Sequence, residues 1–156
     1  KNIKAYISYD KLILKINEKK EPHRYYLELE NDKDNISEFL DCIIRLTTVD
    51  AFSIKEIKKD KYKVYIDKDK VKNKLVLRNR LEGDIFSPIG LKGSKKLKDY
   101  FIDEKIPREE RDNIYFIADG KDVVWIIGGR LSEKYKITEN TKEAIEINII
   151  RGLYDE

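Results

Sequence analysis

The residues of this chain whose types and spacing could support chemistry are basic, and they are concentrated in one stretch. Between Lys72 and Lys98 eight lysines and arginines stand against two acidic residues, so this stretch carries a net charge of +6, whereas the whole chain of 156 residues carries only +3. Lysine and arginine side chains neutralise phosphates and release the counterions around them. Such a concentration of positive charge is typical of a surface that binds a nucleic-acid backbone.

The end of this basic stretch has the pattern of a loop followed by a helix. Proline and glycine residues between positions 88 and 93 predict an exposed loop, and Ser94 is placed to cap a helix over residues 95–104. Apolar residues recur at helical spacing within that range, which leaves the lysines on the solvent side. Pro107 predicts the end of this helix and the start of a second one.

Two explanations fit the lysines of the first helix. Lys95, Lys96 and Lys98 form the pattern KKxK. That pattern is common on solvated amphipathic helices, where the charges only keep the surface soluble. It also fits a surface that grips phosphates, and neighbouring basic residues favour this second explanation.

Two arginines follow an apolar strand that we predict over residues 75–77. Side chains alternate along a strand, so Arg78 and Arg80 are expected to reach the surface on the same side of the pleat. Charges at an exposed sheet edge are the alternative interpretation. A tight turn at Gly83-Asp84 would then bring the basic loop back beside them. We expect one continuous phosphate-binding surface made of Arg78, Arg80, Lys92, Lys95, Lys96 and Lys98.

The sequence shows no pattern for nucleotide or metal chemistry. It contains neither a P-loop nor a GxGxxG motif, and the glycine-rich run 90–94 lacks the spacing that cradles a triphosphate. The chain has one histidine and one cysteine, Cys42, which lies in an apolar run. Its acidic residues are scattered. We therefore assign no catalytic residue, no metal ligand and no cofactor to this chain.

Apolar patterns predict an α+β fold with a mainly antiparallel or mixed β-sheet and two or three short helices packed on it. A loop is expected over residues 31–35. Trp125 is expected in the core, opposite the apolar face of the first helix. The strongest local signal is the Asp119-Gly120 turn between two apolar runs, which predicts a hairpin. Strands are predicted over residues 3–16 (as a hairpin), 25–30, 40–48, 61–66, 75–77, 114–118, 123–127, 134–137 and 144–150.

Composition predicts one globular domain, because 40% of the residues are hydrophobic and 40% are charged. We find no membrane segment or leader pattern and expect a cytoplasmic protein. The chain begins at Lys1 without methionine. We take it as a fragment of a longer protein, although processing or tag removal would give the same start.

The second half of the sequence also contains a series of elements that match a known family in order. They are Arg78-Asn79-Arg80, Gly83-Asp84, Pro88, Gly90, Lys92-Gly93, Lys95-Lys96-Leu97-Lys98-Asp99, Phe101, Ile106-Pro107, Arg111, Trp125, Gly128, Arg130, Ser132-Glu133, Lys136 and Thr138. Together they resemble the C-terminal domain of bacterial tRNA(Ile)-lysidine synthetase. The resemblance divides the domain 1–156 into a β-rich lead-in, residues 1–70, and a family-matching core, residues 71–156.

This resemblance implies a parent enzyme, a ligase of tRNA modification that uses ATP and lysine to convert the wobble cytidine of tRNA(Ile) to lysidine. The family binds ATP through an SGGxDS-type loop in its N-terminal domain, and no such loop occurs here. We therefore expect the fragment to be inactive alone. The implied partners are tRNA(Ile), near its acceptor stem, and the parent's catalytic domain. The resemblance adds Arg111 and Arg130 to the expected RNA-binding residues.

A second hypothesis belongs to a different class of protein. The chain could be an interaction or structural domain that docks on the catalytic domain without touching RNA, with its lysines serving only solubility. Salt-sensitive RNA binding by the chain separates the two hypotheses.

Overall fold

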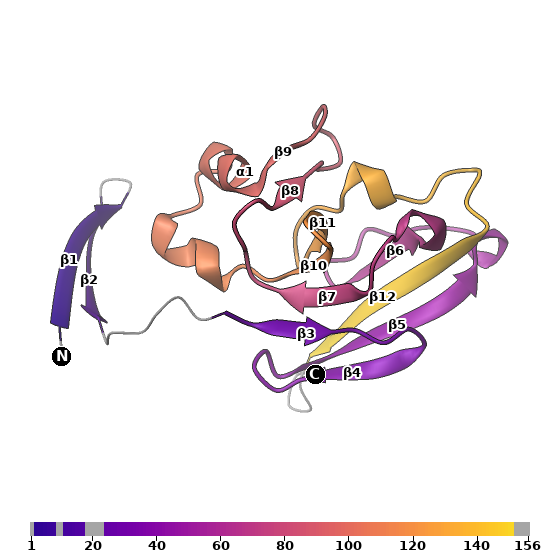
Figure 1. Ribbon diagram of the computed structural model, residues 1–156, viewed down its shortest axis with the longest axis horizontal. Helices are drawn as coiled ribbons and strands as arrows, with labels where there is room; N and C mark the ends of the chain where they lie inside the picture. Colours follow the sequence, from indigo (N-terminus) through magenta and orange to yellow (C-terminus); the bar gives the residue numbers. More distant parts are fainter. Residues whose placement is uncertain (1, 9–10, 18–23, 152–156) are drawn as a thin grey trace.

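The computed structural model describes residues 2–8, 11–17 and 24–151 (Figure 1). The first two strands, β1 (Asn2–Ser8) and β2 (Lys11–Asn17), pair antiparallel with each other from Asn2↔Asn17 to Ser8↔Lys11. This confirms the hairpin predicted over residues 3–16. The other described strands form two larger sheets.

The first of these sheets has six strands in the order β3-β7-β10-β11-β8-β9. All its neighbours are antiparallel except β11 and β8, which are parallel. The predicted hairpin around Asp119-Gly120 is present as β10 and β11. The strands are β3 (Tyr26–Glu28), β7 (Leu75–Arg78), β8 (Ile85–Phe86), β9 (Lys95–Lys96), β10 (Phe116–Asp119) and β11 (Asp122–Ile126).

The second large sheet has four antiparallel strands in the order β4-β5-β12-β6. Its central pair is rich in isoleucine, valine and threonine, whose branched side chains suit a pleated surface. The strands are β4 (Lys33–Ser37), β5 (Cys42–Asp50), β6 (Lys63–Asp67) and β12 (Glu143–Arg151). The loop expected over residues 31–35 is therefore wrong, because most of that range belongs to edge strand β4.

The helical segments of the described chain are short. The described residues contain one α-helix, α1 (Leu97–Asp103), and four 3₁₀ helices. These are η1 (Ala51–Ser53), η2 (Lys68–Lys70), η3 (Arg108–Asn113) and η4 (Glu133–Tyr135). Pro107 does end the first helical region and precede the second, as predicted, but the second is the 3₁₀ helix η3. The strand expected over residues 134–137 is wrong, because its first half lies in η4. The α+β fold class is confirmed.

The start of α1 also differs from the prediction. Lys95 and Lys96 form strand β9 against β8, so the helix begins two residues later, at Leu97. Ser94 does not cap it. The Ser94 hydroxyl is instead hydrogen-bonded to the Ser87 hydroxyl at 2.6 Å, and the N-cap residue Lys96 makes no side-chain capping bond.

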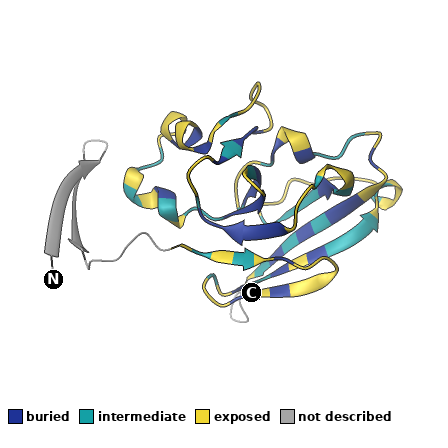
Figure 2. Ribbon diagram, in the orientation of Figure 1, coloured by how far each residue is buried: buried dark blue, intermediate teal, exposed yellow. Residues whose placement is uncertain are grey.

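The six-stranded sheet is covered on both faces, and this produces three layers. One face packs against the four-stranded sheet through a core that contains Leu77, Ile117, Ile145 and Ile147. The other face packs against α1 through a second cluster, which includes Phe86, Leu97, Tyr100, Phe101 and Phe116. Figure 2 shows the buried residues along β7 and along the middle of β12, where the two sheets meet.

Trp125 is buried, as predicted, but it lies on the other side of the sheet from α1. Its side chain is 1% exposed and belongs to the core between the sheets. The cause is a register shift between β10 and β11, where Ile117 pairs with Trp125 and Ala118 pairs with Val123. Such a bulge breaks the alternation of the strand. Val124 and Trp125 therefore join the inter-sheet core, and Val123 and Ile126 face α1.

Two buried aspartates connect elements that are distant in sequence. Asp119, at the end of β10, accepts hydrogen bonds from the backbone N–H groups of Lys72 and Asn73 at 2.9 and 2.7 Å. It also accepts one from the Tyr135 hydroxyl at 2.8 Å. Burial, together with this bond, raises the pKa of Tyr135. The hairpin turn thus anchors both the segment before β7 and η4.

The second buried aspartate is Asp84, which forms a bidentate ion pair with Arg78. The Arg78 Nη1 and Nη2 atoms donate to the two carboxylate oxygens at 2.9 and 2.7 Å, and the side chains are only 3% and 2% exposed. The guanidinium also donates to the carbonyl of Gly120 and lies 5.1 Å from the centre of the Phe116 ring. The expectation that the end of this strand delivers Arg78 to the surface is therefore wrong.

We predict that Trp125→Ala destabilises the protein by about 3 to 5 kcal/mol, since it removes a large ring from the core between the sheets. The control is Ile102→Ala on α1, where the side chain is 55% exposed and the expected loss is below about 0.5 kcal/mol. Denaturant unfolding measures both. A loss below about 1 kcal/mol for Trp125→Ala would contradict this packing.

We also predict that Asp84→Ala costs about 3 to 5 kcal/mol, because it leaves the buried Arg78 guanidinium without its carboxylate. The double change Arg78→Met with Asp84→Leu should cost less than this single change, because it removes both charges. Asp34→Ala is the matched control, since the Arg45–Asp34 pair is almost half exposed and water screens its attraction, so its loss should cost far less than the loss of Asp84. Equal losses for Asp84→Ala and Asp34→Ala in urea unfolding would rule out the proposed difference.

Candidate nucleic-acid interface

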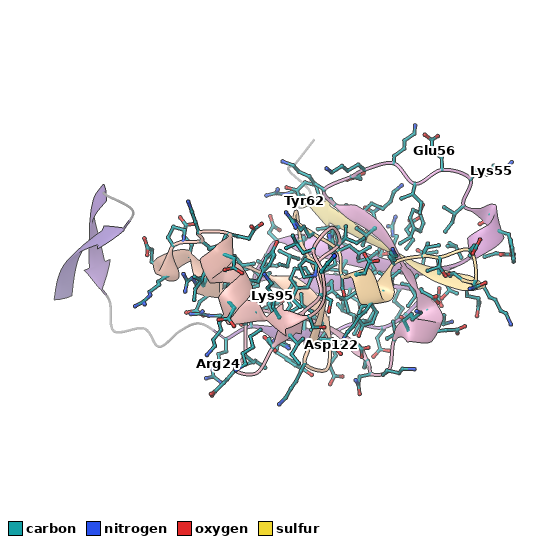
Figure 3. All side chains as sticks on the ribbon, turned by 90° about the horizontal axis from the view of Figure 1, so that it is seen from above. Arg24, Lys55, Glu56, Tyr62, Lys95 and Asp122 are labelled. Carbon is teal, nitrogen blue, oxygen red and sulfur yellow. The ribbon has the colours of Figure 1, made fainter. Side chains whose placement is uncertain are left out.

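A cleft of about 460 Å³ lies where the turn between β7 and β8 meets the start of α1. Four separate segments line it: the segment before β3, the turn after β7, the junction of β9 with α1, and the end of η3. The lining residues are Arg24, Asn79, Arg80, Leu81, Glu82, Gly83, Asp84, Lys96, Leu97, Lys98 and Asp112. In Figure 3, Arg24 lies far from Lys55 and Glu56, on the opposite side of the body formed by residues 24–151.

The turn at the floor of the cleft is fixed by the buried ion pair. The Asp84 carboxylate accepts a hydrogen bond from the Leu81 N–H at 2.7 Å, and the Asp84 carbonyl accepts one from the Leu97 N–H at 2.9 Å. Gly83 occupies the turn with φ +90°, a backbone conformation that side-chain-bearing residues rarely adopt. The pair of Arg78 and Asp84 therefore holds the turn against the first residue of α1.

Strand β9 explains why only one of two adjacent lysines reaches the cleft. Successive residues of a strand point to opposite faces. Lys96 lines the cleft, whereas the Lys95 side chain is 29% exposed and donates a hydrogen bond to Asp103 at 2.8 Å. Lys98, in the first turn of α1, joins Lys96 in the cleft. Lys96 and Lys98 are exposed, as expected, whereas Lys95, which was also expected on the solvent side, is only partly exposed.

The segment that carries Arg24 is held in place by Asn79. The Asn79 side-chain oxygen accepts a hydrogen bond from the Tyr25 N–H at 3.1 Å, and its amide nitrogen donates to the Asp112 carbonyl at 3.0 Å. On the same side, the Arg80 Nε donates to the Asp112 carboxylate at 2.7 Å. One asparagine thus brings the start of β3 and the end of η3 to the cleft.

The cleft has cations that are not neutralised by the protein. Arg24, Lys96 and Lys98 are exposed, and none of them forms an ion pair with any residue that the structure describes. Arg80 is one-third exposed and shares its charge with Asp112. Cations without an internal partner are available to phosphate oxygens.

Three of the residues expected to bind RNA, namely Arg80, Lys96 and Lys98, meet in this cleft. Lys92 is exposed in the preceding loop and does not line it. Gly90 and Gly93 of that loop have φ values of +86° and +73°.

Arg111 and Arg130 are also outside the cleft. Arg111 is 9% exposed, and its Nε donates to the Ile106 carbonyl at 3.0 Å, which supports the bend before η3. Arg130 is 41% exposed and lies 3.7 Å from the Glu104 carboxylate.

Sequence reasoning did not find Arg24. It precedes an ordinary strand and is 56 positions from Arg80, with no local pattern to connect them. The backbone pairing of β3 with β7, from Tyr26↔Arg78 to Glu28↔Val76, is what places it beside the cleft.

Among residues 24–151, no three histidine, cysteine, aspartate or glutamate side chains are arranged to hold a metal ion. No helix in the part of the chain that the structure describes is long and apolar enough to cross a membrane.

Comparison with known proteins identifies relatives of the chain. Residues 75–148 match the family model described as the TilS substrate C-terminal domain. Proteins named tRNA(Ile)-lysidine synthase are similar over most of the chain. The one from Caldanaerobacter subterraneus subsp. tengcongensis is 39% identical over 149 residues, which cover 93% of this chain and 31% of that protein. The one from Clostridium acetobutylicum is 40% identical over 156 residues, which cover 96% of this chain and 33% of that protein.

The chain thus spans about a third of the length of these relatives. A solved structure described as the crystal structure of a TilS C-terminal domain has the same fold, with a TM-score of 0.66 at 23% identity. The match covers 86% of this chain and 100% of that one. The part of the chain that the family model matches, residues 75–148, therefore belongs to the family of the TilS substrate C-terminal domain.

Proposed function

We propose that this chain is the tRNA-binding domain of a tRNA(Ile)-lysidine synthetase and that the cleft lined by Arg24, Arg80, Lys96 and Lys98 grips the RNA backbone. The observation that carries the proposal is the presence of three cations without ion pairs on separate elements around one cleft. The longer relatives named tRNA(Ile)-lysidine synthase support the choice of ligand.

Double-stranded RNA suits such a cleft. An A-form stem presents its phosphates and 2′-hydroxyls across a wide, shallow minor groove, and proteins recognise it mostly through them. The backbone around the cleft is fixed by buried contacts. Binding therefore costs little ordering of the protein, and the stabilisation from each phosphate contact is retained as affinity.

In this proposal the parent enzyme uses ATP and lysine to modify the wobble cytidine of tRNA(Ile) in the cytoplasm. This domain would hold the tRNA towards its acceptor stem while the catalytic domain acts on the anticodon. ATP and lysine would bind to the parent's N-terminal domain, because the chain has no nucleotide-binding loop.

We predict that Lys96→Ala combined with Lys98→Ala weakens tRNA binding by about tenfold or more at moderate salt. Two lost phosphate contacts should also make the slope of log affinity against log salt shallower by about two. Lys95 is left out of the variant because it pairs with Asp103. A gel-shift titration at several salt concentrations measures both quantities.

The matched control is Lys58→Ala combined with Lys59→Ala, which removes the same charge from an exposed segment outside the cleft. It should change affinity and slope much less, and both double variants should keep the melting temperature of the unmutated chain. If the two doubles lose affinity equally, net charge alone drives binding. If the chain binds no tRNA at any salt concentration, docking on the catalytic domain becomes the better explanation.

A further prediction is that the chain alone neither hydrolyses ATP nor attaches lysine to tRNA, because it lacks a loop that cradles a triphosphate. Purified chain would be incubated with tRNA(Ile), ATP and labelled lysine, with a full-length synthetase as the positive control. Label incorporated into tRNA by the chain alone would disprove this prediction.

A further inference from the structure

Three carboxylates line the cleft, and two of them are neutralised by arginine. Asp84 pairs with Arg78, and Asp112 pairs with Arg80. Glu82 is exposed and makes neither an ion pair nor a hydrogen bond with any residue that the structure describes. It is therefore an unpaired negative charge among the cations of a cleft that we propose to bind phosphates.

The position of Glu82 is set by the backbone. It precedes Gly83 in the turn whose ends are joined by the Asp84 N–H donating to the Leu81 carbonyl at 3.3 Å. The Lys121 ammonium also reaches this turn, since it lies 3.4 Å from the position that a Cβ atom on Gly83 would take. The Glu82 carboxylate is thus carried on a fixed turn, with cations on neighbouring elements.

A carboxylate repels phosphates, so Glu82 lowers affinity unless it forms a favourable contact with another group of the ligand. An ionised carboxylate can only accept hydrogen bonds. RNA offers it base amino groups and 2′-hydroxyls as donors. In the minor groove, which is the accessible groove of an A-form stem, the only base amino group is the 2-amino group of guanine.

We propose that Glu82 reads the 2-amino group of a guanine in the minor groove of the bound RNA stem. The surrounding cations grip the phosphates, and the carboxylate between them selects for a G·C pair at one position. This inference rests on the proposed function of the cleft and extends it from backbone binding to base selection.

The test uses a short RNA stem-loop with G·C pairs and a second one in which inosine replaces guanosine. Inosine lacks only the 2-amino group, and melting curves must show that both stems are folded at the assay temperature. The unmutated chain should bind the guanosine stem roughly tenfold more tightly than the inosine stem, as expected for one hydrogen bond to a charged group.

Glu82→Ala should reduce this ratio to about one while leaving the melting temperature of the protein unchanged. Glu82→Gln should keep part of the ratio, because its amide oxygen still accepts a hydrogen bond. Glu56→Ala, which removes an exposed carboxylate outside the cleft and far from Arg24, should keep the full ratio (Figure 3).

The outcomes separate this inference from the proposed function. The base-reading role of Glu82 is overturned if the unmutated chain binds both stems equally and with steep salt dependence. It is also overturned if Glu82→Ala retains the affinity ratio. In both cases the phosphate-binding role of the cleft stands. If the unmutated chain binds neither stem, the proposed function fails and this inference fails with it.

Discussion

The buried ion pair between Arg78 and Asp84 is the interaction on which the cleft depends. One carboxylate accepts from the guanidinium and from the Leu81 N–H, and the guanidinium also holds the carbonyl of Gly120. The pair therefore joins the end of β7, the following turn and the β10–β11 hairpin. A buried ion pair is a poor source of net stability, because desolvation offsets most of its Coulomb energy. Its value here is positional: it fixes the turn that carries Glu82 and abuts α1.

The rest of the fold makes that position rigid. The six-stranded sheet is packed on both faces, by the four-stranded sheet on one side and by α1 on the other. The bulge in β11 directs Trp125 into the inter-sheet core and leaves Ile126 to pack against the helix side. The elements that carry the cations of the cleft are thus part of a packed framework, and this framework sets the spacing of the cations without a ligand.

Local sequence signals predicted the elements that depend on local physics. Asp119-Gly120 between two apolar runs predicted the β10–β11 hairpin, and the apolar spacing of Leu97, Tyr100 and Phe101 predicted the buried face of α1.

Non-local pairing could not be predicted. The partner of Arg78 is a carboxylate six residues later, which reaches it only because the chain turns back. Arg24 reaches the cleft only through the pairing of β3 with β7. Lys95 and Lys96 differ in exposure because β9 pairs with β8, and two residues are too few to show a strand period.

Lysine reactivity tests most directly whether RNA occupies the cleft, as we propose. The protein would be acetylated under limiting conditions with and without tRNA, and the modified lysines quantified by mass spectrometry. We expect tRNA to protect Lys96 and Lys98 from acetylation, while Lys58 and Lys59 stay as reactive as in the protein alone. Protection of Lys58 and Lys59 with unchanged reactivity at Lys96 and Lys98 would contradict it.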